Sequence, residues 1–248
     1  MRVDICMTAA LRPDIVVQTL ESIKANMSLM VSAAFFHSFR LIVDIANVGD
    51  TQYTQQDVVD AIGNTVPGWD VIIRALPAGS VQAEALRWTW ETSDSSFILQ
   101  WEDDWVLEKP TSLQVLLRAF LSFKRLGMLY LDRTGKSVLD YPGYSKGTFE
   151  KVGNGFYRRK KGKSLGGPPA VLSRQYINAV MPLLDGVTCL DVISPTKKAQ
   201  KILSNWDLFV FTGLDNKGSL VRDIGKEWRA ERGLKMVKNT ERGVTWVK

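Results

Sequence analysis

The sequence predicts an α/β protein in which a mostly parallel β-sheet is flanked by helices. Short apolar runs alternate with segments whose apolar residues recur every three or four positions, which indicates strands and amphipathic helices in turn. The 248 residues suffice for one large α/β domain. Three consecutive carboxylates follow one of the apolar runs, and open α/β sheets bind their ligands at the carboxyl ends of strands.

The strands expected in the first half are short and apolar, and several are rich in β-branched side chains. They cover Val3–Met7, Phe39–Val43, Val71–Ile73, Phe97–Trp101 and Met128–Leu131. Helical segments alternate with these strands. This order predicts parallel pairing with right-handed crossovers.

The first helix is expected to begin at Pro13 and Asp14, because proline suits the first helical position and an acidic side chain suits the first turn. Ser80 is expected to cap a later helix, since its hydroxyl oxygen can accept a hydrogen bond from a free backbone N–H. The further helices are expected over Asp57–Ile62, from Ser80 through Trp90, and over 111–126.

The second half of the sequence is less regular. Glycines mark many turns after residue 132. The elements expected there are helices over Arg174–Leu184 and Thr196–Leu203 and a strand over Trp206–Phe211. We therefore expect a single domain with a regular half, 1–131, and a looser half, 132–248. The charged tail, 222–242, is expected to be ordered partly by ligand.

The charge of the chain favours an anionic partner. Its formal net charge is +6, which suits nucleic acid, an anionic membrane or a sugar nucleotide. The densest basic run is Tyr157–Lys163. Two interpretations of this run stay open: a solvated surface loop, or a mobile loop that contacts phosphate.

Residue usage excludes several catalytic classes. The single histidine, His37, removes Ser-His-Asp, Cys-His and histidine–metal mechanisms almost entirely. Cys6 and Cys189 form neither a disulfide framework nor a zinc pattern. No apolar stretch is long enough to span a bilayer and the first residues do not resemble a signal peptide, so we expect a cytoplasmic location, or the host cytoplasm if the protein is viral.

The triplet Glu102-Asp103-Asp104 is the strongest functional signal. Adjacent carboxylates repel one another and are costly to desolvate, so we expect a cation beside them. A hard divalent ion that also binds phosphates suits such oxygen ligands. The alternative is a turn whose carboxylates cap the helix near Thr111. The sequence lacks the P-loop and dinucleotide-binding motifs, which argues against those two classes.

Four segments in order resemble the GT-A glycosyltransferases, especially the large inverting family that uses nucleotide-diphosphate sugars. The first, Met7–Ile23, is similar to the family's opening strand, Arg-Pro turn and helix. Val43-Asp44 is similar to the strand end that reads the nucleobase, and Gly79–Trp90 to the helix beside the sugar nucleotide. Glu102-Asp103-Asp104 resembles the DxD motif, with glutamate at its first position.

The resemblance implies a donor site at the strand ends and an acceptor side in the second half. The donor-binding residues it implies are Thr8, Ala9, Arg12, Asp44 and Asp103. The metal ligands it implies are Asp104 and Glu102, holding Mn²⁺ or Mg²⁺, with a UDP-sugar as the expected donor. If strand alternation continues through the motif, Glu102 and Asp104 point one way and Asp103 the other.

The resemblance also implies a general base, which deprotonates the acceptor, well beyond the DxD motif. Asp191 occupies that place, with leucine where the family has a preceding glutamate, and Asp185 is the second candidate. Late in the chain, Arg222 or Lys226 is expected to close over the diphosphate, and Asp223 stands where a histidine is common.

The acceptor is the least determined part of this prediction. The basic residues Arg158, Arg159, Lys160 and Lys161 favour an anionic polymer, and our leading expectation is a modified base in DNA, as in viral DNA glycosylation. A surface polysaccharide or a lipid-linked acceptor stays open. A nucleotidyltransferase and a non-catalytic nucleic-acid-binding protein are the competing classes.

Overall fold

The structure is a computed structural model that describes residues 3–28, 39–50, 52–77, 81–133, 148–160, 167, 169–188, 196–214, 219–239 and 243–247. The elements up to residue 131 follow the predicted alternation. They are β1 (Val3–Leu11), α1 (Pro13–Asn26), β2 (Met27–Ser28), β3 (Phe39–Gly49), α2 (Gln55–Thr65), β4 (Asp70–Ala75), α3 (Gln82–Thr92), β5 (Phe97–Glu102), β6 (Trp105–Leu107), β7 (Thr111–Ser112), α4 (Leu113–Ser122) and β8 (Leu126–Leu131).

The second half contributes further strands to the same sheet. Its elements are β9 (Phe149–Gly153), β10 (Phe156–Arg159), β11 (Ala170–Ser173), α5 (Arg174–Val180), a 3-10 helix (Met181–Leu183), α7 (Lys197–Leu203), β12 (Asp207–Phe211), β13 (Val221–Asp223), α8 (Gly225–Glu231), β14 (Lys235–Asn239) and β15 (Gly243–Val247). The predicted helix Arg174–Leu184 is therefore present as α5 followed by the 3-10 helix.

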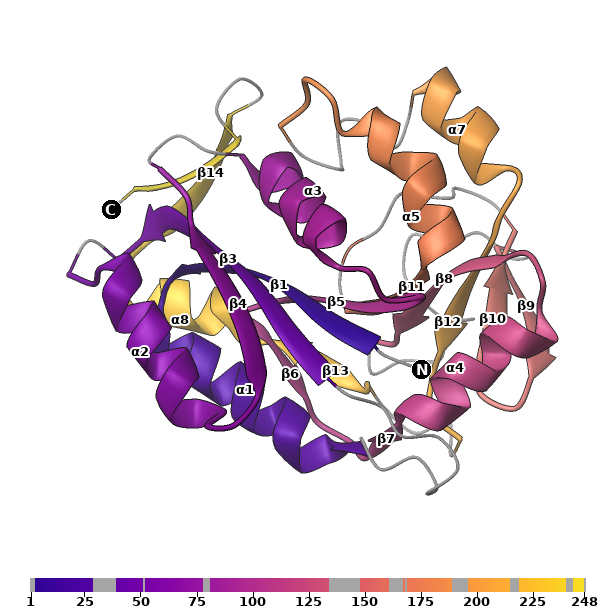
Figure 1. Ribbon diagram of the computed structural model, residues 1–248, viewed down its shortest axis with the longest axis horizontal. Helices are drawn as coiled ribbons and strands as arrows, with labels where there is room; N and C mark the ends of the chain where they lie inside the picture. The colour runs from indigo at the N-terminus through magenta and orange to yellow at the C-terminus, as the bar shows by residue number, and fades with distance from the viewer. Residues whose placement is uncertain are drawn as a thin grey trace.

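A nine-stranded sheet forms the centre of the molecule, in the order β4-β3-β1-β5-β11-β8-β12-β10-β9 (Figure 1). Strands β4, β3, β1 and β5 pair in parallel, and so do β8 and β12. Strand β11 runs antiparallel between β5 and β8. The predicted class, an α/β protein with a largely parallel sheet and flanking helices, is confirmed, and the antiparallel insertion at β11 was not predicted.

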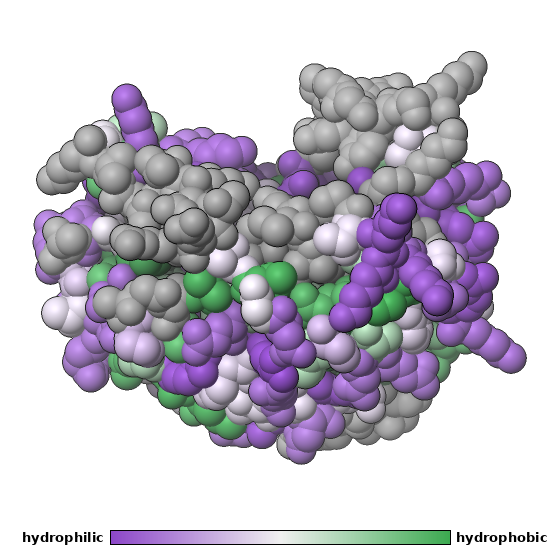
Figure 2. Space-filling view, turned by 90° about the horizontal axis from the view of Figure 1, so that it is seen from above, coloured by the Kyte–Doolittle hydropathy of each residue, from purple (hydrophilic) through white to green (hydrophobic). Residues whose placement is uncertain are grey.

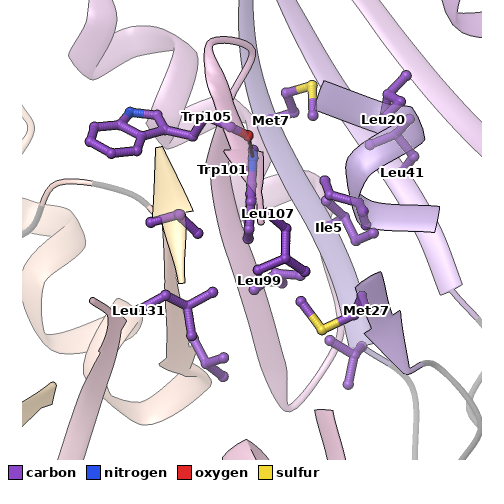
Figure 3. Packing of buried hydrophobic residues seen from close by; sticks show 14 of the residues in the cluster. Ile5, Met7, Leu20, Met27, Leu41, Leu99, Trp101, Trp105, Leu107 and Leu131 are labelled. Carbon is purple, nitrogen blue, oxygen red and sulfur yellow. Dashed lines mark hydrogen bonds between the residues drawn. The ribbon is translucent and has the colours of Figure 1, made fainter. Parts of the chain in front are cut away.

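Two apolar layers cover the sheet. On one face, α1, α2 and α4 pack on side chains such as Ile5, Met7 and Trp101. On the other, α3, α5 and α7 pack on Cys6, Ile42 and their neighbours. Figure 1 shows α3 and α5 on the opposite side of the strands from α1 and α2. Figure 3 shows part of the first layer, where labelled side chains from β1, β3, β5, β6 and α1 gather.

Local capping explains where several helices begin. Thr54 and Asp57 form a reciprocal capping box at the start of α2. Ser112, Ser173 and Thr196 accept a backbone N–H at the starts of α4, α5 and α7. Because Ser112 caps α4, the alternative in which the carboxylate triplet caps this helix is wrong. The predicted cap Ser80 lies outside the described residues, and α3 starts after Val81.

The helices of the described residues are short compared with a membrane span. None of the helices in the described ranges is long and apolar enough to cross a bilayer. The face in Figure 2 is mostly hydrophilic, with a band of hydrophobic residues across its middle.

Candidate active site

A row of polar side chains crosses four strands toward their carboxyl ends. It lies at the end of β4 and β5, while β1 and β3 continue past it to Leu11 and Gly49. In the sheet register Thr8 of β1 lies opposite both Asp44 of β3 and Glu102 of β5, and Asp44 lies opposite Arg74 of β4. Residues in register point to the same face of a sheet. That face is covered by α3, because Gln82 Nε2 donates a hydrogen bond to Glu102 Oε1 at 3.0 Å. The sheet thus brings three predicted site residues together under the first turn of α3.

Asp44 is buried in this row and only half satisfied. Arg74 Nε donates to Asp44 Oδ2 at 2.7 Å, while Oδ1 is buried and has no hydrogen-bond partner within the described ranges. Burial raises the pKa of Asp44 to about 6, although the Arg74 hydrogen bond and charge act in the opposite direction. The Arg74 guanidinium also lies 4.6 Å from the centre of the Trp88 ring. A buried acceptor beside a fixed cation suits a ligand that offers both an N–H and a carbonyl.

Asp103 lies on the other side of the strand end and is fully engaged. Its Oδ2 accepts from the Ala10 backbone N–H at 2.9 Å and from Arg12 Nε at 3.1 Å, and its Oδ1 accepts from Arg12 Nη2. Thr19 Oγ1 donates to the Asp103 backbone oxygen. Arg12 is 4% exposed and Asp103 is 2% exposed. Arg12 and Asp103 therefore hold the turns after β1 and β5 together. The resemblance had implied a role in donor binding for both residues.

Asp104 is the carboxylate of the triplet that meets the C-terminal segment. Its Oδ2 accepts from Arg12 Nη1 at 3.1 Å and lies 3.7 Å from Arg229 Nη1. Its backbone oxygen accepts from the Ile224 N–H at 2.9 Å. Strand β13 pairs with β6 so that Asp223 lies opposite Trp105. The segment from Val221 to Arg229 is thereby fixed against the acidic motif.

The predicted alternation within the triplet is wrong. Strand β5 ends at Glu102, and the next two residues form the turn into β6. Both Asp103 and Asp104 therefore contact Arg12, while Glu102 contacts α3. Burial raises the pKa of Glu102 to about 8, and repulsion from Asp104 and Asp103 adds to the rise.

The carboxylates suit a metal ion that is also bound by substrate phosphates better than a metal ion whose ligands all come from the protein. Among the described residues, no three His, Cys, Asp or Glu side chains are grouped so as to hold a metal. Both oxygens of Asp103 are taken by Arg12 and Ala10. Asp104 Oδ1 has no partner in the described part of the chain, and Mg²⁺ in nucleotide sites is often bound by one or two carboxylates together with substrate phosphates. Asp104 thus suits one ligand of an ion whose other ligands come from a diphosphate.

The candidate general base lies outside the described residues, but the chain leading to it is placed. The backbone oxygen of Thr188 accepts from the Ala83 N–H at 3.2 Å, in the first turn of α3. The described range 169–188 therefore ends beside the first turn of α3, which also carries Gln82. Asp185 is exposed and forms an ion pair with Arg87 on α3.

The remaining predicted residues occupy three different places. Thr8 is half-buried in the polar row, and Ala9 is 4% exposed and packs in the apolar layer on the α1 side. Arg158 and Lys160 lie within 4.0 Å of the carboxylate of Glu150, and Arg158 also lies 4.0 Å from that of Asp207. Arg159 ends β10, and Lys161 lies outside the described residues.

The basic run is distant from the polar row within the sheet. Strands β11, β8 and β12 separate β10 from β5. At about 4.8 Å between neighbouring strands, β10 lies roughly 19 Å from β5 across the sheet. The sheet therefore does not bring the described part of the basic run to the strand ends that carry Asp44 and Glu102.

Sequence reasoning missed Arg74 and Arg229. Arg74 follows the predicted strand Val71–Ile73 directly, and a polar residue at that strand end was the signal that could have found it. Arg229 has no comparable signal, because only the docking of α8 brings it to Asp104. The expected cations are instead paired elsewhere: Arg222 with Glu108 and Glu227, and Lys226 with Asp223.

Comparison with solved structures identifies the fold. Residues 1–349 of Staphylococcus aureus TarS, in complex with UDP, match with a TM-score of 0.54 and 10% identity over 90% of this chain and 60% of TarS 1–349. The same part of TarS without UDP gives a TM-score of 0.53 at 10% identity, over 93% of this chain and 63% of that one. A longer TarS structure gives 0.52 at 9% identity, over 90% and 36%.

The fold is that of the GT-A glycosyltransferases. The predicted resemblance is thus confirmed at the level of the fold. No protein-family model matches the chain, and no curated protein matches it. The chain spans about 60% of the length of TarS 1–349.

Proposed function

We propose that this protein is a glycosyltransferase that takes its sugar from a UDP-sugar. The observation that carries the proposal is the buried Oδ1 of Asp44, unpartnered among the described residues, beside Arg74 in the carboxyl-terminal half of the strands of a GT-A sheet. Ligands of open α/β sheets bind at this edge. The structure of TarS in complex with UDP supports uridine as the base.

The Asp44–Arg74 pair suits uracil on chemical grounds. The uracil N3–H would donate to Asp44 Oδ1, and a neighbouring carbonyl would accept from the Arg74 guanidinium. Adenine lacks this pairing of a ring N–H with a carbonyl, because its only base donor is the exocyclic amino group and its acceptors are ring nitrogens. The pair therefore favours UDP over ADP.

Asp104 and Arg229 are proposed to receive the diphosphate. Asp104 would help to hold a Mn²⁺ or Mg²⁺ ion, which would offset the charge of the leaving group. Arg229 lies 3.7 Å from Asp104 Oδ2 and adds a fixed positive charge at this place. The ion pair of Arg12 with Asp103 keeps the motif in position without contacting the donor.

Asp191 is proposed as the general base. It would take the proton of the acceptor hydroxyl as that oxygen attacks the anomeric carbon. The bond between that carbon and the diphosphate breaks, and UDP leaves with the electron pair, which inverts the anomeric centre. The support is the hydrogen bond from the Ala83 N–H to the Thr188 backbone oxygen, which holds Thr188, three residues before Asp191, at the first turn of α3.

The acceptor is proposed to be an anionic polymer in the cytoplasm, with a hydroxymethylated base in DNA as the first candidate. The net charge of +6 supports this class. The ion pairs of Arg158 and Lys160 with Glu150 reduce the free charge of the basic run. A surface polysaccharide or a lipid-linked acceptor is the alternative to test alongside DNA.

The deciding experiment measures nucleotide binding and products. Isothermal titration with UDP, GDP and ADP, each with and without Mn²⁺, should show preferential binding of UDP that is lost in Asp44→Ala. Asp60→Ala in α2 serves as a surface control. Incubation with UDP-sugars and candidate acceptors should release UDP. In a parallel incubation with UTP and sugar phosphates, release of pyrophosphate would identify a nucleotidyltransferase instead. The absence of any nucleotide binding would favour the non-catalytic class.

A further inference from the structure

Gly225, the first residue of α8, lies directly against the side chain of Asp104. A Cβ atom placed on Gly225 would come within 2.1 Å of Asp104 Oδ2 and within 2.8 Å of Asp104 Cβ and Cγ. Real Cβ atoms essentially never approach other atoms this closely. The described structure therefore has no room for any side chain at position 225 while Asp104 keeps its position.

The backbone at Gly225 does not itself require glycine. The described glycines with positive φ are Gly49, Gly68, Gly155, Gly186, Gly213 and Gly233. Gly225 is not among them, and it occupies a helical position where alanine is the better helix former. The reason for glycine at 225 is thus the space occupied by the Asp104 carboxylate.

The start of α8 cannot easily move away from this carboxylate. The Ile224 N–H donates to the Asp104 backbone oxygen at 2.9 Å, and β13 pairs with β6 just before it. Asp223 Oδ1 accepts from the Gly225 N–H at 3.0 Å and from the Lys226 N–H at 3.3 Å. Arg12 holds the same Asp104 oxygen from the opposite turn. The carboxylate is therefore confined between two fixed backbones.

We propose that Gly225 is a positioning residue that sets the orientation of the Asp104 carboxylate and thereby the affinity for the donor diphosphate. The inference rests on the proposed function, because it gives Asp104 a role in donor binding. A side chain at 225 would push the carboxylate away from Arg12 and Arg229, or push α8 off the turn. Either displacement removes the arrangement in which Asp104 Oδ1 and Arg229 serve the same ligand.

The test is a double-mutant cycle between positions 225 and 104, with UDP and Mn²⁺ as the probe. Gly225→Ala should weaken UDP binding at least tenfold, measured by titration calorimetry. Gly63→Ala is the matched control, because Gly63 is an exposed glycine in α2 whose added Cβ would meet nothing within 4 Å. It should raise the thermal midpoint slightly and leave UDP binding unchanged.

The second background is Asp104→Gly, which removes the three atoms nearest to the new Cβ. Adding Gly225→Ala there should change neither UDP affinity nor the thermal midpoint by much, because the effect acts through the Asp104 side chain. If Gly225→Ala alone does not fold, the double variant should fold. Equal losses in both backgrounds, or a double variant that also fails to fold, would overturn the proposal.

The two proposals fail in different ways. If the wild-type protein binds no nucleoside diphosphate, the proposed function fails. The thermal-midpoint cycle then still reports whether residue 225 acts through Asp104. If the wild type binds UDP and Gly225→Ala binds it equally well, the positioning role fails and the proposed function stands.

Discussion

Arg12 and Asp103 form a buried ion pair that joins the turn after β1 to the turn after β5, through hydrogen bonds from two guanidinium nitrogens to both carboxylate oxygens. The third guanidinium nitrogen of Arg12 bonds Asp104 at 3.1 Å. One arginine thus pairs with two of the three carboxylates of an acidic motif whose sequence suggests a cation site. This leaves Asp104, rather than Asp103, as the carboxylate that can bind a ligand.

Removing Arg12 is expected to destabilise the fold strongly. Arg12→Met leaves Asp103 buried without its partner, and breaking a buried ion pair in this way costs about 3–5 kcal/mol. Urea denaturation at pH 7 measures the loss. The deficit should shrink at pH 5, since protonation of Asp103 removes the unpaired charge. Arg87→Met, which breaks an exposed pair with Asp185, should change stability little, and an equally small loss in Arg12→Met would contradict this account.

The pKa of Asp44, raised to about 6 by burial, predicts opposite pH dependences for stability and for binding. The folded state binds the Asp44 proton more tightly than the unfolded state does, so its contribution to stability is present below about pH 4 and is lost as the pH rises through 6. UDP binding needs the carboxylate as acceptor, so its affinity should fall as the pH drops below about 6. Asp44→Asn should flatten both profiles, and a UDP affinity that stays constant between pH 5 and 7 would rule out this role.

Donor binding should stabilise the protein through Asp104. UDP at a hundred times its dissociation constant adds about 2.7 kcal/mol, which corresponds to roughly 5–10 °C in the thermal midpoint for a chain of this size. With Mn²⁺ present the wild type should show this shift, and Asp104→Asn should lose the metal-dependent part. Calorimetric scans with and without a chelator measure it. A shift of the same size in Asp104→Asn would place the ion elsewhere.

Asp191 should affect turnover without affecting donor binding. Asp191→Asn keeps the size of the side chain but cannot accept the proton, so kcat should fall by about 10²- to 10⁴-fold while the affinity for UDP is unchanged. Asp185→Asn is the comparison, because Asp185 is exposed and paired with Arg87. If Asp185→Asn loses turnover and Asp191→Asn does not, the base assignment moves to Asp185.

Much of the fold was predictable because its signals are local. The start of α1 at Pro13, the cap of α7 at Thr196 and the end of β5 near Glu102 follow from nearby residues alone. The apolar runs located β4, β5 and β8 within a few residues of their observed bounds and the starts of β1 and β3, whose observed ends lie at Leu11 and Gly49 instead of Met7 and Val43. The antiparallel insertion of β11 between β5 and β8 was not predictable in this way, because pairing partners are set by contacts between distant segments.

The sequence by itself determined that polar residues follow the apolar runs of the strands of an α/β sheet, because apolar periodicity depends on neighbouring residues. It therefore identified Asp44 and the triplet at Glu102. Only the tertiary structure decided which carboxylates are free, because this depends on charges brought from far along the chain. Arg12 forms hydrogen bonds with Asp103, which lies 91 residues later in the sequence. Helix α8 brings Arg229 and Gly225 to Asp104. A side-chain oxygen paired in three dimensions is unavailable to a ligand, however suggestive its place in the sequence.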